Sequence, residues 1–295
     1  MVEGVVPIPL PHELREEVIL PTAFQQQMAE RGWTVVHLRQ TYTDPEVFRQ
    51  QWLVCPNGAI YPGHTFYRAF GTTAFRKLFR YTLSHAPCTR ETLEQICPHP
   101  ALLTTWLTFL QDQEWFHFRG RWFERGTYQA QISNIGRTLE WYVAEWFRFT
   151  YSISHRVPVQ HGVQLAELPL PGDLDVVALV GTDLLTVVEC KSASVVDEAH
   201  FSLFLQRVQA FHPDVAILLI DTPAPFSPER IAACNAALSH LGHTALVGSR
   251  GFYRGGHGLY IVNVEHSIAM SLNDVLQHHH KRTPSQVAFE IPHTK

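Results

Sequence analysis

The stretch that decides the fold reads Gly172-Asp-Leu-Asp-Val-Val-Ala-Leu-Val-Gly-Thr-Asp-Leu-Leu-Thr-Val-Val-Glu-Cys-Lys-Ser192. It holds two apolar segments, Asp173–Val180 and Leu184–Lys191, which are separated by the turn residues Gly181-Thr-Asp183. Strand-forming runs around such a turn are typical of a β-hairpin. The stretch therefore predicts two adjacent antiparallel strands in a sheet.

The hairpin is expected to gather charged residues at one end. Asp175 near the start of the first strand should lie beside Glu189 near the end of the second. Side chains alternate along a strand, so Glu189 and Lys191 share a face while Cys190 points the other way. Such charges are costly to bury without partners. We expect a divalent cation held by the two carboxylates, with Asp173 as an alternative ligand.

These residue types suit the hydrolysis of a phosphodiester. Mg²⁺ takes oxygen ligands and keeps several waters, so Asp175 and Glu189 could hold it, or Mn²⁺ in its place. The metal would polarise the phosphate and lower the pKa of a water molecule. Lys191 would orient that water or neutralise charge on the phosphate. The structural alternative is a salt bridge between Glu189 and Lys191.

The segments around the hairpin predict a mixed α/β sheet that helices cover on both faces. Further strands are expected at Val157–Leu165, Val215–Ile220, Thr244–Val247 and Gly258–Val264, and helices at Asn134–Phe149, Asp197–Phe211 and Pro228–Leu241. The first of these helices carries Glu140 beside its apolar stripe. Glu140 is a candidate metal or water ligand, or else a solvated helix residue.

Asp175, the Glu189-Cys190-Lys191 triplet and the preceding helix with Glu140 together resemble the PD-(D/E)xK, or restriction-endonuclease-like, nuclease superfamily. The Gly-Asp-Leu-Asp-Val-Val form is similar to its Mrr-like and Holliday-junction-resolvase-like branches. Leu174 stands where the name-giving motif has proline. The resemblance implies a restriction-endonuclease-like fold and a magnesium endonuclease. It also implies that Gln206 lies near the substrate, against the alternative of a surface glutamine.

Residues 72–127 predict a winged-helix-like α+β module. Three short helices, at Thr72–Ser84, Arg90–Ile96 and Ala101–Gln111, precede an aromatic hairpin over Trp115–Arg125. In winged helices the third helix enters a DNA groove and the hairpin contacts the backbone. Three hairpin residues would suit phosphate contact: Arg119, Arg121 and Arg125. The third helix has no Lys or Arg, which favours the alternative of a packing or dimerisation module.

The whole chain has a formal net charge of −4, so a nuclease must place positive charge locally or rely on metal ions. The five cysteines include no C-x-x-C pair, and the start lacks the pattern of a signal peptide, which favours the cytoplasm. No apolar run has the length of a membrane span. We read His278-His279-His280 as a solvated polar run rather than a metal site.

Four regions are expected: 1–71 of unknown role, the module at 72–127, a nuclease domain at 130–250, and a C-terminal strand and tail at 251–295. The preferred function is a Mg²⁺-dependent endonuclease acting on nucleic acid, with DNA as the expected partner. A homodimer or a partner protein would suit a cut in two strands. Fold analogy alone suggests prokaryotic defence or a mobile element. The alternative is a catalytically inactive nuclease-like module that binds nucleic acid or a protein.

Overall fold

The computed structural model describes residues 21–38, 65–112, 115–126, 135–151, 158–181, 184–192, 196–222, 227–240, 245–249, 251–256, 258–264 and 267–280. The segment Asp44–Trp52, whose sequence suggests a helix, lies outside them. These residues include an eight-stranded sheet with the order β1-β5-β6-β7-β8-β11-β10-β9. The strands are β1 (Val35–Leu38), β5 (Val159–Leu165), β6 (Leu174–Val180), β7 (Leu184–Lys191), β8 (Val215–Ile220), β9 (Val247–Ser249), β10 (Phe252–Arg254) and β11 (Leu259–Asn263).

The predicted hairpin is the centre of this sheet. Strands β6 and β7 are antiparallel, with Val176 opposite Val188, and Gly181 turns the chain between them at a φ of 68°. Strand β7 then runs parallel to β8, and β8 runs parallel to β11. The sheet is therefore mixed, as expected, and β7 and β8 end at the same edge.

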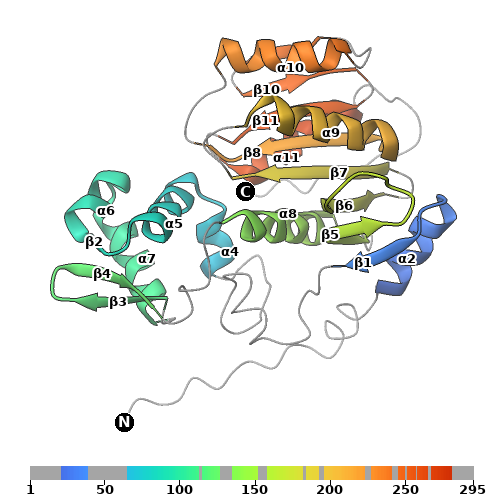
Figure 1. Ribbon diagram of the computed structural model, residues 1–295. Helices are drawn as coiled ribbons and strands as arrows, with labels where there is room; N and C mark the ends of the chain where they lie inside the picture. Colours follow the sequence, from blue (N-terminus) through green and yellow to red (C-terminus); the bar gives the residue numbers. More distant parts are fainter. Residues whose placement is uncertain are drawn as a thin grey trace.

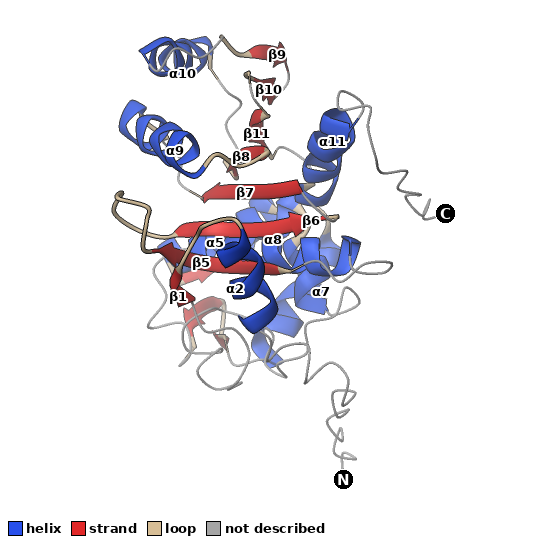
Figure 2. Ribbon diagram, turned by 90° about the vertical axis from the view of Figure 1, so that its right-hand side faces the viewer, coloured by secondary structure: helices blue, strands red, loops and turns tan. Residues whose placement is uncertain are grey.

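Helices cover both faces of the sheet (Figure 2). One face carries α8 (Gly136–Tyr151) and α11 (Ile268–His280), and the other carries α2 (Pro21–Glu30), α9 (Glu198–Phe211) and α10 (Pro228–His240). Strand alternation separates the packing: Val176 and Val188 belong to the core under α8, and Val177 and Val187 to the core with α2 and the end of α9.

The expected order of three helices and a hairpin is present beside the sheet (Figure 1). The elements are α4 (Thr65–Phe70), α5 (Thr73–His85), β2 (Cys88–Thr89), α6 (Arg90–Ile96), α7 (Pro100–Asp112), β3 (Phe116–Arg119) and β4 (Trp122–Arg125). We call residues 65–126 the N-terminal module. Strand β2 was not expected; it pairs with β4 in a three-stranded sheet. Thr72 and Thr89 cap α5 and α6 through their side chains.

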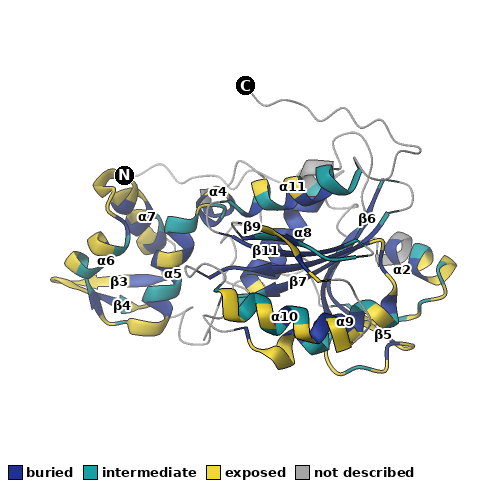
Figure 3. Ribbon diagram, turned by 90° about the horizontal axis from the view of Figure 1, so that it is seen from above, coloured by how far each residue is buried: buried dark blue, intermediate teal, exposed yellow. Residues whose placement is uncertain are grey.

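The N-terminal module and the sheet share one hydrophobic core. Its residues are among those drawn dark blue in Figure 3. The ring of Phe66 in α4 lies 5.0 Å from that of Trp115 in the module and 6.2 Å from that of Trp141 in α8. All three side chains are almost completely buried. The expected domain boundaries stay predictions, but the apolar packing is continuous from the module to helix α8.

Both ends of the described chain pack with the large sheet. Strand β1 pairs with β5, with Val35 opposite Leu165, so part of the N-terminal region belongs to the large sheet. The C-terminal region is more than a strand and tail. It holds β10 and helix α11, whose apolar residues share one face: Ile268, Leu272, Val275 and Leu276. The histidine run is the last turn of α11, where His278 contacts Arg254, so it is not a fully solvated segment.

No helix in the described residues is long and apolar enough to cross a membrane.

Candidate active site at the ends of strands β6 and β7

The hairpin brings Asp175 and Glu189 to neighbouring positions. The pairing of Val176 with Val188, continued by one residue, places Asp175 opposite Glu189. Residues directly opposite each other in an antiparallel pair project to the same face. Their neighbours Val177 and Val187 both pack in the core with α2 and α9, so this is the face that α9 covers. The expectation that the two carboxylates share a face agrees with this register.

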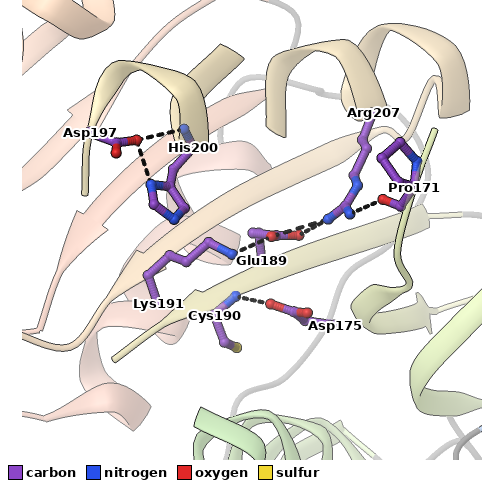
Figure 4. Close-up of polar contacts among 8 residues, drawn as sticks. All are labelled: Pro171, Asp175, Glu189, Cys190, Lys191, Asp197, His200 and Arg207. Atoms are coloured by element: carbon purple, nitrogen blue, oxygen red, sulfur yellow. Dashed lines mark hydrogen bonds and ion pairs between the residues drawn. The ribbon is translucent and has the colours of Figure 1, made fainter. Parts of the chain in front are cut away.

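Asp175 is a buried carboxyl group with one strong hydrogen bond. The backbone N–H of Cys190 donates to its Oδ2 atom over 2.7 Å (Figure 4). Burial raises the pKa of Asp175 well above its usual value, and the charges of Glu189 and Glu140 raise it further. Burial is the larger cause and the neighbouring carboxylates add to it, so a cation bound here would favour the charged form of Asp175.

Glu189 is also buried, and its charge is shared by two cations (Figure 4). Lys191 Nζ donates to Oε1 over 2.7 Å. Arg207 Nη1 lies 3.2 Å from Oε1 and 3.1 Å from Oε2. The salt bridge that we weighed as the structural alternative is therefore present, with an arginine added to it. A buried carboxylate held in this way has a fixed orientation.

Arg207 was not singled out from the sequence. It comes from α9, is almost completely buried, and donates from Nη2 to the carbonyl oxygen of Pro171 over 2.5 Å. The guanidinium lies so close to Gly172 that a Cβ atom there would be 2.6 Å from Nη2, and Gly172 has a φ of 89°. The available signal was helical spacing, since Arg207 follows Phe204 by three residues and precedes Phe211 by four.

Lys191 is the more accessible cation of the site. Burial works against its charge, but the carboxylates of Glu189 and Asp175 outweigh this and raise its pKa above the ordinary value. Its side chain is 24% exposed, whereas that of Glu189 is 4% exposed. Lys191 therefore stays protonated at neutral pH and can reach solvent. An ammonium group has three protons, so the bond to Glu189 leaves others that could meet a phosphate or a water molecule.

The other candidate residues differ in their relation to this cluster. Glu140 is buried in α8, and its charge acts on Asp175, so it lies near the cluster. Asp173 lies just before β6 and is partly buried. Gln206 is exposed and donates to Ser202 Oγ over 3.3 Å, on the outer side of α9. The structure thus brings Arg207, rather than Gln206, to the expected site.

The three hairpin arginines also differ. Arg119 is 79% exposed and pairs with Glu124 at 3.4 Å. Arg121 is exposed and lies 5.3 Å from the ring of Trp122. Arg125 donates to the carbonyl oxygen of Leu83 at the end of α5, so it ties the hairpin to that helix. The first two present charge to solvent at the hairpin tip, and Arg125 has a structural partner.

The donor set fits a magnesium ion with few protein ligands. Mg²⁺ is usually bound by one or two carboxylates and several waters, and Asp175 and Glu189 supply two carboxylates at adjacent strand ends. Among the described residues, no group of three or more His, Cys, Asp or Glu side chains is arranged to hold a metal ion. Glu189 would have to share its oxygens between the ion and the two cations that contact it.

The Asp175 carboxyl group gives a test of this charge balance. Its raised pKa means that the folded protein binds the proton more tightly than the unfolded chain. This contribution to stability is fully present below the ordinary carboxyl pKa and is lost as pH rises through the folded pKa. Asp175→Asn keeps an acceptor for the Cys190 N–H and removes the charge. We expect it to raise the melting temperature of the metal-free protein at pH 7 by at least about 2 °C.

Thermal unfolding in EDTA between pH 5 and pH 8 measures this effect. Wild type should lose more stability than Asp175→Asn as the pH rises. Asp173→Asn is the matched control and should behave as wild type. If Asp173→Asn gives the stabilisation and Asp175→Asn does not, the buried excess charge has been placed on the wrong aspartate.

Comparison with known proteins corrects one expectation. No protein-family model matches the chain, and no curated protein matches it. Among solved structures, the chain is similar to Can2 from Sulfobacillus thermosulfidooxidans in complex with cyclic tetra-adenylate, with 15% sequence identity and a TM-score of 0.39. The match covers 88% of this chain and 60% of Can2. At this TM-score the similarity establishes neither a common fold nor a common activity.

The expected membership of an Mrr-like or Holliday-junction-resolvase-like branch of the PD-(D/E)xK superfamily is therefore wrong. No family model supports it, and the similarity found is to Can2. The physical reason is that the motif rests on one hairpin. An aspartate on one strand and Glu-x-Lys on the next can be brought together by strand pairing and alternation, which occur in many sheets. The pattern alone therefore does not identify a protein family.

Proposed function

We propose that the chain is a nuclease that depends on a divalent cation and hydrolyses phosphodiester bonds in nucleic acid, DNA in particular. The observation that supports this most is the buried carboxylate pair of Asp175 and Glu189 on adjacent strands, with the partly exposed side chain of Lys191 beside it. A buried acid with a raised pKa, here Asp175, next to an accessible cation is common at functional sites.

The side chains would divide the work as follows. Asp175 and Glu189 would hold Mg²⁺ or Mn²⁺, with Glu140 as a further ligand directly or through water. The ion would supply positive charge against the phosphate and make water a stronger nucleophile. Lys191, protonated at neutral pH, would donate to a phosphate oxygen or orient the attacking water. Arg207 would keep the Glu189 carboxylate in one orientation.

Cleavage of supercoiled plasmid is the direct test. Purified protein should nick it in Mg²⁺ or Mn²⁺ and not in EDTA, and a single-stranded RNA of similar length tests the preference for DNA. A folded protein that cleaves neither substrate with any divalent cation would contradict the proposal.

One observation favours a second candidate, a nuclease-like module that binds nucleic acid or a protein without cleaving. Both oxygens of Glu189 contact cations of the protein itself, so the cluster could serve as a structural ion pair. The two candidates differ in their response to metal. Only the nuclease should gain thermal stability from millimolar Mn²⁺, because a bound ion stabilises the folded state.

The module with residues 65–126 is proposed to contact the nucleic acid through its hairpin tip, in the manner of a winged helix. We expect Arg119→Ala combined with Arg121→Ala to weaken binding, because both side chains are exposed at the tip. The slope of log affinity against log salt should fall by about 0.9 for each lost phosphate contact. Fluorescence anisotropy with a duplex at several salt concentrations measures both quantities. Lys77→Ala, an exposed cation on α5, is the control.

Unchanged affinity in the double variant would favour the alternative, in which the module serves only for packing.

A further inference from the structure

A buried ion pair joins the N-terminal module to the edge of the sheet that carries Lys191. Arg76 in α5 has no exposed surface, and its Nε donates to Asp221 Oδ2 over 3.0 Å. Arg80, one turn further along α5, donates from Nη2 to the same oxygen and to the Asp221 carbonyl oxygen, both over 2.9 Å. Asp221 directly follows β8 and is buried. Two cations of the module therefore hold one carboxylate of the sheet.

The other hydrogen bonds of Arg76 fix its position within the module. Nη1 donates to the carbonyl oxygen of Phe70 over 2.9 Å, and Nη2 donates to Thr73 Oγ1 over 3.2 Å. Removing charges from water is costly, and well-packed apolar residues often replace such pairs without loss of stability. Stability alone therefore does not account for a charged contact inside an apolar core. Directional hydrogen bonds fix the relative positions of the paired groups more closely than apolar packing does.

Asp221 is also bonded to the catalytic strand. Strands β7 and β8 are parallel, with Lys191 beside Ile220. The backbone N–H of Asp221 donates to the carbonyl oxygen of Lys191 over 2.8 Å. The residue held by the two arginines is thus hydrogen-bonded to the main chain from which the Lys191 side chain projects. One residue, Asp221, therefore connects α5 to the main chain at Lys191.

We propose that Asp221 is a positioning residue for Lys191, and that Arg76 and Arg80 hold it in place from the N-terminal module. This inference rests on the proposed function, because it assigns the module a part in cleavage. A shift of α5 would move Asp221 and with it the carbonyl group of Lys191. A ligand or partner that displaces the module would then change the rate of cleavage without touching the carboxylates.

The test compares Arg76→Met with the double variant Arg76→Met, Asp221→Asn. The single variant leaves a carboxylate with one cation and should be less stable. The double variant removes the charges of Arg76 and Asp221; Arg80, which is 25% exposed, keeps its bond to the carbonyl oxygen of residue 221, so the melting temperature of this variant should recover to near wild type. Its kcat should nevertheless fall about tenfold, while KM for the substrate and Mn²⁺ affinity measured by calorimetry stay within about twofold. A control pair on α6, Arg90→Met with Glu94→Gln, removes an exposed ion pair of the same module and should change none of these.

Amide hydrogen exchange supplies a readout that does not need cleavage. Exchange at residue 221 should be at least tenfold faster in Arg76→Met, and Arg80→Met, which removes a partly exposed cation, should show a smaller increase and remain folded. Unchanged exchange in these variants, or a kcat that returns with the melting temperature in the double variant, would overturn the inference. If wild type cleaves nothing, the proposed function fails, and the exchange measurement still decides whether the module holds the Lys191 strand.

Discussion

Lys191→Ala should reduce plasmid cleavage by about 10²- to 10³-fold, the effect expected when a group that stabilises charge in the transition state is removed. The reason is the position of the ammonium: it is held by Glu189 and is the more accessible cation of the site. We expect the variant to keep a melting temperature close to wild type, because Arg207 still contacts both oxygens of Glu189.

Initial rates of nicking at saturating Mg²⁺, with thermal unfolding of the same preparations, measure this prediction. Lys77→Ala is the matched control, since it removes an exposed lysine from α5. A folded Lys191→Ala protein that nicks at the wild-type rate would remove Lys191 from the mechanism.

Glu189→Ala should also abolish cleavage, but the structure indicates that this substitution destabilises the protein as well. Truncation at this position leaves the Arg207 guanidinium buried without its carboxylate, which is strongly destabilising. Loss of cleavage in Glu189→Ala would therefore mix chemistry with stability. Glu189→Gln retains the size of the side chain and is therefore the better variant to compare with Lys191→Ala in the cleavage assay.

Arg207→Met should lower the free energy of unfolding by about 3–5 kcal/mol, the usual cost of removing one partner of a buried ion pair. Arg207 is the buried partner of Glu189, and it also donates to the carbonyl oxygen of Pro171. Both groups would lose a hydrogen-bond donor. Equilibrium denaturation in urea measures the change.

The control for this effect lies one residue away. Gln206 is exposed on the same helix, and Gln206→Met should change the free energy of unfolding by less than about 0.5 kcal/mol. The pair Glu189→Gln with Arg207→Met removes both charges and should recover part of the loss. A cost below about 1 kcal/mol for Arg207→Met would mean that water replaces the guanidinium and that Glu189 is not held as described.

The hairpin could be predicted because its determinants are local. Apolar runs, a glycine turn and strand alternation lie within residues 172–192, and they specify that Asp175 and Glu189 meet. Helix α5 could be predicted for the same reason, since Thr72 and the apolar spacing that follows are adjacent in sequence. Elements of this kind carry their own signal and depend little on the rest of the chain.

The remaining parts of the site depend on contacts between distant residues. Arg207 reaches Glu189 only because α9 packs across the sheet, and Arg76 meets Asp221 from 145 positions away. The place of strand β1 at the edge of the large sheet follows from its pairing with β5, which lies far away in the sequence. Charged residues in apolar stripes, such as Arg76 and Arg207, were the available signs of such contacts. Their partners could not be identified before the sheet order was known.

The core shared by the N-terminal module and helix α8 bears on how such a chain can evolve. The aromatic contact of Phe66 with Trp141 crosses from the module to α8, and Arg76 adds a charged contact between the module and the sheet. Recombination that exchanged this module for another would open an apolar face of α8 to water and leave Asp221 without its cations. A replacement would have to provide matching aromatic surface and the arginines together. Exchange of the module alone is therefore expected to destabilise the sheet that it packs against.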